Sequence, residues 1–255
     1  MTSPHSLFSR NGLIWGQTQS GKTYRAKFFL QECPHHCIFV NTQLVPDVEQ
    51  YAEATASDNV EVIRAIEQGK HKICVNYKLD WNDSDSYLMK VDHLIQLIFT
   101  IAKNNPHHFK ITLIVDEIDK FVTKHQCSPS FDNLFNRGLR FNINAIGIAH
   151  SPADIHNKVI GSSSWFLFYL ATTDVVLYWK KRGIYLDELK FGHYEGYYWE
   201  SGSLWLFSHN RPADAPPDLQ EDQLLRPEMQ EPDKMGGSDV SPTKQDLDPN
   251  LHDSQ

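Results

Sequence analysis

Short apolar segments alternate with longer amphipathic stretches along most of the chain. Runs of five or six apolar residues, separated by helical patterns, are typical of buried strands in a parallel sheet. Because right-handed crossovers place helices on both faces of such a sheet, we expect an α/β fold with a central, mainly parallel sheet flanked by helices. The expected strands are Gly12–Gly16, Cys37–Asn41, Ile73–Tyr77, Ile111–Val115, Ala145–Ala149 and Trp165–Leu170.

The stretches between these strands predict helices. Their apolar residues recur at the spacing of a helix that buries one face. The expected helices are Lys22–Gln31, Val48–Gln68, Tyr87–Ala102, Phe131–Leu139 and Pro152–Val159.

The pattern changes after Asp174. Two aromatic-rich runs, His193–Trp199 and Ser203–Ser208, flank the segment Glu200-Ser201-Gly202. Alternating apolar runs around a short glycine-containing turn predict a C-terminal β-hairpin.

Residues 211–255 differ in composition from everything before them. This segment is rich in Pro, Asp, Glu, Gln and Ser and has four Lys or Arg against eleven Asp or Glu. Such a segment buries too little apolar surface to offset its ordering entropy, so we predict a disordered acidic tail. Residues 1–210 then form the folded domain. The tail carries most of the net charge of −8, so this charge does not exclude nucleic-acid binding by the folded domain.

The sequence indicates a protein of the cytoplasm. No apolar N-terminal run resembles a signal peptide, and no stretch of about 18 apolar residues is present to cross a bilayer. The four cysteines are expected to be free thiols in a reducing compartment.

Gly16-Gln17-Thr18-Gln19-Ser20-Gly21-Lys22-Thr23 fits the P-loop pattern G-x-x-x-x-G-K-[ST] in full. The glycines allow the backbone to curl so that its N–H groups face an anion, and the positive end of the following helix adds to that field. Lys22 would reach the β- and γ-phosphates, and the Thr23 hydroxyl would bind Mg²⁺. The apolar Leu13-Ile14-Trp15 before the loop is the expected strand. We therefore predict ATP and Mg²⁺ as cofactors.

A second candidate element is the acidic pair at the end of the strand Ile111–Val115, namely Asp116 and Glu117. Asp116 would hold Mg²⁺ through its water shell. Glu117 would polarise the attacking water as a general base. GTPases usually lack this glutamate and carry an Asn-Lys-x-Asp guanine reader. Here Asn157-Lys158 is followed by Val159-Ile160, which favours ATP.

The third element is Arg137-Gly138-Leu139-Arg140-Phe141, followed by an apolar strand and Ala149-His150-Ser151-Pro152-Ala153-Asp154-Ile155. With the P-loop and the acidic pair, this element resembles the FtsK–HerA superfamily of DNA-pumping P-loop ATPases (the RecA-like, or ASCE, class), over residues 10 to 208. Within that superfamily the chain is most similar to genome-packaging ATPases of tailless, membrane-containing double-stranded DNA viruses of the PRD1 kind. Zot-like morphogenesis proteins of filamentous phages are also similar.

The resemblance implies roles for three further residues. His150 stands where the family usually has a glutamine sensor, commonly within Thr-Gln-Arg-Pro, and can donate a hydrogen bond to a γ-phosphate as glutamine does. The family's Gly-Arg pair is here Gly138-Leu139, with Arg137 and Arg140 on either side. An arginine acting in the neighbouring subunit's site is implied, and we favour Arg140 over Arg137. The alternative is that both are solvated cations at a helix end.

Two other clusters admit a functional interpretation beside a structural one. Cys33-Pro34-His35-His36-Cys37 contains four potential zinc ligands, but no second ligand pair is evident, which favours a helix-to-strand loop. Lys180-Lys181-Arg182 lies beside Tyr178 and Trp179. It is either a solvated surface or a contact for nucleic-acid phosphates in a central channel.

Together with the resemblance, these features lead us to expect an ATP-hydrolysing motor that moves viral double-stranded DNA into a capsid. The resemblance implies a homo-oligomeric ring, a hexamer, that works in the host cytoplasm or with the virion. The tail would dock to a capsid vertex or a membrane protein. The alternatives are a Zot-like assembly or secretion ATPase, a slowly hydrolysing nucleotide-gated binding module, and an AAA+ machine, which would need a helical lid that the sequence does not suggest.

Overall fold

The computed structural model describes residues 4–17, 20–44, 46–77, 84–169, 172–186 and 195–208, which all belong to one compact unit, Met1–Leu225. The predicted tail, residues 211–255, lies outside the described residues. Tail and domain boundary therefore stay predictions.

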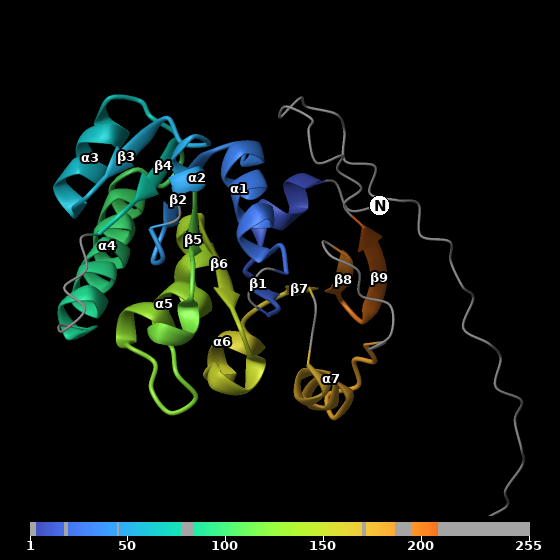
Figure 1. Ribbon diagram of the computed structural model, residues 1–255. Helices are drawn as coiled ribbons and strands as arrows, with labels where there is room; N and C mark the ends of the chain where they lie inside the picture. The colour runs from blue at the N-terminus through green and yellow to red at the C-terminus, as the bar shows by residue number, and fades with distance from the viewer. Residues whose placement is uncertain are drawn as a thin grey trace, which may run out of the picture. The chain divides into compact units, whose positions relative to one another are not determined.

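The described strands form one nine-stranded sheet in the order β3-β4-β2-β5-β6-β1-β7-β8-β9 (Figure 1). The strands from β3 to β7 in this order pair in parallel, and β8 and β9 extend the sheet in antiparallel pairing. The mainly parallel α/β sheet predicted from the sequence is confirmed. The strands are β1 (Gly12–Trp15), β2 (His36–Val40), β3 (Ala54–Ala56), β4 (Lys72–Val75), β5 (Ile111–Val115), β6 (Ile143–Ala149), β7 (Trp165–Phe168), β8 (Glu195–Glu200) and β9 (Ser203–Ser208).

Helices connect the strands. The α-helices are α1 (Lys22–Glu32), α2 (Pro46–Glu49), α3 (Asn59–Glu67), α4 (Ser84–Asn104), α5 (Pro129–Arg137), α6 (Asn157–Gly161) and α7 (Thr173–Lys180). Short 3₁₀ segments are η1 (Pro4–Ser9), η2 (Ile118–Lys120), η3 (Gly138–Phe141) and η4 (Pro152–Asp154).

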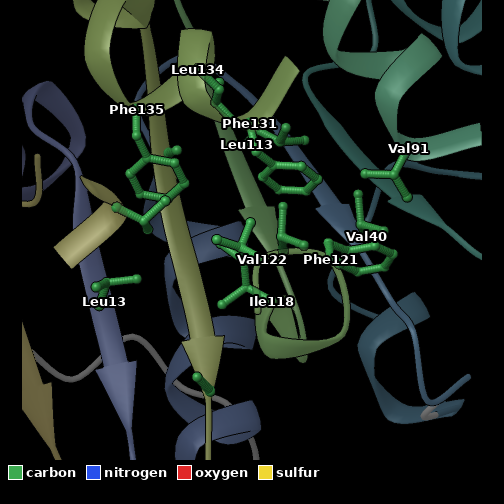
Figure 2. Close-up of a cluster of buried hydrophobic side chains, with 14 of the residues drawn as sticks. Leu13, Val40, Val91, Leu113, Ile118, Phe121, Val122, Phe131, Leu134 and Phe135 are labelled. Atoms are coloured by element: carbon green, nitrogen blue, oxygen red, sulfur yellow. The ribbon is translucent and has the colours of Figure 1, made fainter. Parts of the chain in front are cut away.

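Alternate strand residues enter two separate cores. In β1, Leu13 and Trp15 pack on one face of the sheet with side chains of α3 to α7, whereas Ile14 packs on the other face with α1, η1 and α2. Strands buried on both faces consist of continuous apolar runs, which explains the sequence pattern. The larger core is shown in Figure 2, where side chains of α4 and α5 meet the sheet around Leu113.

One close approach fixes the position of β7 against β1. Gly12 pairs with Trp165 in parallel register, and a Cβ at Gly12 would lie 2.0 Å from the Trp165 ring. Trp165 is fully buried, and its ring packs edge-on against Phe29 of α1 at a centroid distance of 5.9 Å. The absence of a side chain at Gly12 therefore makes room for the largest side chain in this core.

The predicted single helix Val48–Gln68 is wrong. The chain forms α2, then β3, then α3. Ala54–Ala56 pairs in parallel with β4, which satisfies backbone groups that the helix would have used. Asp58 then caps α3 by accepting the Glu61 N–H at 2.8 Å, and Glu61 accepts the Ser57 N–H at 2.7 Å. This reciprocal capping starts a new helix at Asn59.

The predicted helix Pro152–Val159 is also interrupted. Only Pro152–Asp154 forms a 3₁₀ turn, Ile155 bridges to Thr123, and α6 begins at Asn157. Similarly, the predicted helix Phe131–Leu139 starts two residues earlier, where Ser128 caps α5 by accepting the Phe131 N–H at 3.3 Å, and gives way to η3 at Gly138.

The C-terminal hairpin is confirmed over the described residues, which exclude residues 193 and 194. Strands β8 and β9 are joined by Ser201 and Gly202, which both have positive φ angles, 52° and 88°. Two such residues suit a tight hairpin turn. The hairpin lies at the opposite end of the sheet from β3 (Figure 1).

Candidate functional site

Three neighbouring strands bring the sequence-predicted site residues to one edge of the sheet. Strand β6 pairs with both β1 and β5, and its register places Ala149 beside Trp15 and Gly147 beside Val115. The carboxyl ends of the three parallel strands therefore lie together, and that is where open α/β sheets bind ligands. The P-loop follows β1, the acidic pair follows β5, and His150 follows β6.

At the two ends of the P-loop, Gly16 and Gly21 both have positive φ angles, which glycine adopts readily. Gly16 has φ of 156°, and a Cβ there would lie 2.6 Å from the Ser20 Oγ. Gly21 is the N-cap of α1, has φ of 105°, and gives the helix no side-chain cap. The N–H groups at this helix end can therefore serve an anion. Thr18 and Gln19 lie outside the described residues, and their predicted ligand contacts stay predictions.

Lys22 begins α1 and bends back over the loop. Its Nζ donates to the Gly16 and Gln17 carbonyl oxygens, at 2.6 Å each. Burial lowers the pKa of Lys22 to about 8, although the nearby Asp116 carboxylate opposes this shift. An ammonium group with little hydration is well suited to interact with phosphate charge.

Asp116 is the most deeply buried acidic residue of this edge, with 3% of its surface exposed. Its Oδ1 accepts the Glu117 N–H at 3.1 Å, whereas its Oδ2 is buried and has no hydrogen-bond partner among the described residues. Burial, together with the Glu117 charge, raises the pKa of Asp116 to about 7. A buried oxygen without a partner next to Lys22 and Thr23 is suited to a cation.

Glu117 has a left-handed backbone, with φ of 46° and ψ of 49°. Its carboxylate accepts hydrogen bonds from Thr42 (at 3.2 Å) and from Gln43, and forms an ion pair with Lys120. Burial alone would raise the pKa of Glu117, but the bonds from Lys120 and Gln43 outweigh it and hold the pKa below its ordinary value. The carboxylate is therefore kept ionised, as a general base requires.

His150 links the end of β6 to this acidic pair. Its Nε2 lies 3.6 Å from the Glu117 Oε1. Its backbone N–H donates to Asp119 Oδ2 at 3.3 Å, and the other oxygen, Asp119 Oδ1, is buried without a partner in the described part of the chain. Burial raises the pKa of Asp119 despite the hydrogen bond from His150. The half-exposed imidazole can reach a ligand between β1 and β5.

These side chains line one pocket. The pocket is bounded by Lys22, Thr23, Gln43, Asp116, Glu117, Ile148, Ala149 and His150. The described residues contain no group of three or more His, Cys, Asp or Glu side chains that could hold a metal alone. A Mg²⁺ site needs no such group, because it uses one or two protein ligands together with water and phosphate oxygens. Thr23 and Asp116 fit that role, and Mg²⁺ bound there would supply positive charge to the phosphates.

The two candidate arginines lie elsewhere. Arg137 ends α5 and Arg140 lies in η3, both exposed and both before β6 begins. Strand β6, which is seven residues long, lies between these arginines and His150. At about 3.3 Å per residue, this strand spans roughly 20 Å. Neither arginine can therefore reach the pocket of its own subunit.

Sequence reasoning missed three residues that hold Glu117. Thr42 and Gln43 follow β2, the strand that pairs with β5 on the side away from β6. Lys120 lies three residues after Glu117 and pairs with it. Polar residues directly after a buried strand were a usable signal for Thr42 and Gln43, because strand ends at one sheet edge converge on the site.

The cysteine-histidine segment connects the end of α1 to β2. Its two cysteines, Cys33 and Cys37, are buried in the smaller core. The Cys33 thiol lies 3.5 Å from the Thr112 hydroxyl.

None of the described helices combines the length and the apolar character needed to cross a membrane.

The sheet order, the P-loop between β1 and α1 and the acidic pair after β5 define a P-loop NTPase fold. No protein-family model matches the sequence, and no curated protein matches it. The fold is similar to that of the genome-packaging NTPase B204 from Sulfolobus turreted icosahedral virus 2, solved with ATP-gammaS. The TM-score is 0.62 at 15% identity over 78% of this chain and 97% of that chain.

Two further solved structures share the fold. The DNA-packaging ATPase B204 from Sulfolobus turreted icosahedral virus gives a TM-score of 0.58 at 15% identity, over 78% of this chain and 96% of that chain. VirB4 of Thermoanaerobacter pseudethanolicus gives 0.54 at 10% identity, over 81% of this chain and 90% of that chain. These similarities confirm the expected P-loop NTPase fold.

Proposed function

We propose that this protein is an ATPase that hydrolyses ATP with Mg²⁺ to translocate double-stranded DNA, as a viral genome-packaging motor. One observation carries the proposal: Lys22, Asp116, Glu117 and His150 line a single pocket at the carboxyl edge of three adjacent parallel strands. This set provides a phosphate-binding cation, a metal-binding carboxylate, a base and a hydrogen-bond donor.

The residues divide the chemistry among themselves. The P-loop N–H groups and Lys22 would bind and orient the phosphates. Thr23 and Asp116 would hold Mg²⁺, which neutralises developing charge when bound. Glu117, kept ionised by Lys120 and Gln43, would accept a proton from the attacking water. His150, beside Glu117, would contact the γ-phosphate and so report whether it is still attached.

Positive charge beyond Lys22 is needed on the transferring phosphoryl group. Within its own subunit, the described pocket is lined by no arginine. A neighbouring subunit could supply Arg140 or Arg137, which are exposed on the opposite edge of the sheet. This requirement supports a ring, for which we keep the hexamer as the proposed state.

Double-stranded DNA is the proposed substrate because two solved structures with this fold are named as genome- or DNA-packaging enzymes. A Zot-like assembly or secretion ATPase, the alternative that the sequence resemblance left open, is the second candidate. A slowly hydrolysing binding module is the third, but the complete set of charged groups around the pocket argues against it.

The decisive measurement is the ATPase rate with and without linear double-stranded DNA, together with the mass of the assembly in both conditions. We expect a ring whose turnover rises with DNA. Turnover that is unaffected by DNA would contradict the motor, and turnover too slow for many cycles would favour the binding module. Lys22→Ala should abolish tight ATP binding, whereas the matched Lys103→Ala, at an exposed position of α4, should retain it.

A further inference from the structure

We infer that the basic turn at the end of α7, Lys180-Lys181-Arg182, is a contact surface for the phosphate backbone of double-stranded DNA. The inference rests on the proposed function, and it identifies the part of the fold that meets the substrate. All three side chains are exposed. They lie together because α7 ends at Lys180 and the chain turns through Gly183, whose φ is 79°.

The charge of this turn is available to a partner. Within the described part of the chain, no carboxylate forms an ion pair with Lys180, Lys181 or Arg182. Arg182 donates to the neutral Asn157 Oδ1 at 3.3 Å. Its guanidinium carbon lies 3.8 Å from the centroid of the Tyr178 ring. Three cations that no described carboxylate neutralises match a polyanion, whose phosphates would release counterions on binding.

Stabilisation of the end of α7 does not explain why all three cations are present. Cations interact favourably with the negative end of the helix dipole, and this explanation covers Lys180 and Lys181. Arg182 lies beyond the helix, however, and is fixed by Tyr178 and Asn157. In the same stretch of the chain, Tyr185 is 69% exposed and Leu177 is 46% exposed. Exposed cations close in the sequence to an exposed aromatic side chain are typical of nucleic-acid surfaces.

The turn is anchored on the strand that carries the P-loop. Trp179, next to Lys180, is 1% exposed and packs against Trp15 at a ring-centroid distance of 6.1 Å and against Phe168 at 5.1 Å. Trp15 directly precedes Gly16 of the P-loop. A rearrangement of the loop during turnover would therefore be transmitted to α7 through two packed indole rings.

A second connection leads to His150. Helix α7 packs against η4, which begins two residues after His150. Arg182 also contacts Asn157, at the start of α6 just beyond η4. The basic turn thus contacts the segment that leaves the nucleotide site from β6. This placement lets the nucleotide state alter the position of the DNA-contacting cations.

The test compares two double variants of the full-length protein. Lys180→Gln with Lys181→Gln removes two charges from the turn but leaves Arg182 on Tyr178. Arg64→Gln with Lys103→Gln removes two charges from exposed positions of α3 and α4 and serves as the matched control. Binding of a fluorescein-labelled random-sequence duplex is measured by anisotropy over a range of salt concentrations. Melting temperature and ATP-analogue binding verify that both variants are folded.

We expect the turn variant to bind the duplex more weakly, with a salt dependence reduced by about one in slope for each lysine that contacts a phosphate. The control should keep the wild-type affinity and slope. Equal losses in both variants, or no loss in either, would overturn the proposed surface while leaving the motor intact. If the wild-type protein neither binds the duplex nor is stimulated by it, the proposed function fails, and the surface fails with it.

Discussion

The His150 Nε2 lies 3.6 Å from the Glu117 Oε1, so that a donor from β6 meets the candidate base from β5. The two residues end adjacent strands, and the pocket between them also contains Lys22 and Asp116. A ligand that draws His150 towards a phosphate would also change the surroundings of the Glu117 carboxylate. The proposed chemistry therefore depends on both strand ends.

The first prediction separates ATP binding from ATP hydrolysis. Glu117→Gln keeps the size of the side chain but removes its ability to accept a proton. ATP binding should persist while turnover falls by roughly 10²–10⁴-fold. Equilibrium binding of a fluorescent ATP analogue and single-turnover hydrolysis measure the two effects. Near-normal turnover would mean that another group is the base, with Asp119 the next candidate.

The second prediction concerns the residues that keep Glu117 ionised. Gln43→Leu removes a hydrogen bond that lowers the pKa of Glu117, so the carboxylate should become protonated at higher pH. The acid limb of the ATPase pH profile should therefore move to higher pH. Gln31→Leu, at an exposed position of α1, is the matched control. An unchanged limb in the Gln43 variant would show that this bond does not influence the base.

The third prediction follows from the burial of Asp116. Its pKa is raised to about 7 in the folded protein, against about 3.9 in an unfolded chain. Between about pH 3.9 and pH 7, the Asp116 carboxyl keeps a proton in the folded state that it has released in the unfolded state. The stability of the metal-free protein should therefore fall as the pH rises through this range.

Asp116→Asn should remove this pH dependence and raise the melting temperature measured in EDTA at pH 8, while impairing Mg²⁺-dependent hydrolysis. Glu67→Gln, an exposed substitution at the end of α3, should change none of these three properties. If Asp116→Asn melts with the same pH dependence as the wild type, the carboxyl does not carry the proposed proton.

The fourth prediction tests whether the site is completed between subunits. The double variant Arg137→Ala, Arg140→Ala should bind ATP but be inactive alone, because an arginine acting in trans contributes about 10³–10⁵-fold in rate. Adding the Lys22→Ala protein, which keeps both arginines, should restore part of the activity through mixed rings. Full activity of the double variant, or no rescue in rings shown to mix, would exclude the trans arginine.

The fifth prediction concerns the turn that carries these arginines. A Cβ on Gly138 would lie 2.7 Å from the Ile143 carbonyl oxygen, so Gly138→Ala must displace backbone where β6 begins. We expect a loss of about 1–3 kcal/mol in the free energy of unfolding. At Gly161 a Cβ would meet nothing within 4 Å, so Gly161→Ala should be neutral or slightly stabilising. Urea denaturation of both variants compares them directly, and equal stability would contradict the close approach.

The strands and the nucleotide site were predictable because their signals are local. A P-loop is contiguous, and a buried strand ending in Asp116 and Glu117 needs no distant residue to be noticed. Strand β3 was not predictable, because three residues with the apolar spacing of a helix become a strand only when β4 is beside them. Helix α7 was not assigned either, since its apolar face, around Trp179, is defined by contact with β1 and β7.

The contact that Gln43 makes with the Glu117 carboxylate could not be predicted for the same reason, because it joins distant parts of the sequence. Gln43 is 74 residues from Glu117 in the sequence, and the two meet only because β2 pairs with β5. Which of the two arginines acts, and whether either does, also depends on a second copy of the chain. The roles of the site residues therefore stay predictions, although Lys22, Asp116, Glu117 and His150 line one pocket.

The contact between Gly12 and Trp165 has a consequence for the divergence of this sequence. Because a Cβ at position 12 would overlap the indole ring, position 12 cannot take a side chain while Trp165 stays as it is. A larger residue at position 12 requires a smaller one at position 165, which in turn loosens the packing on Phe29 of α1. Related chains should therefore exchange volume between these two positions as a coupled pair. Such paired exchange would reveal distant kinship even where the identity of individual residues has been lost.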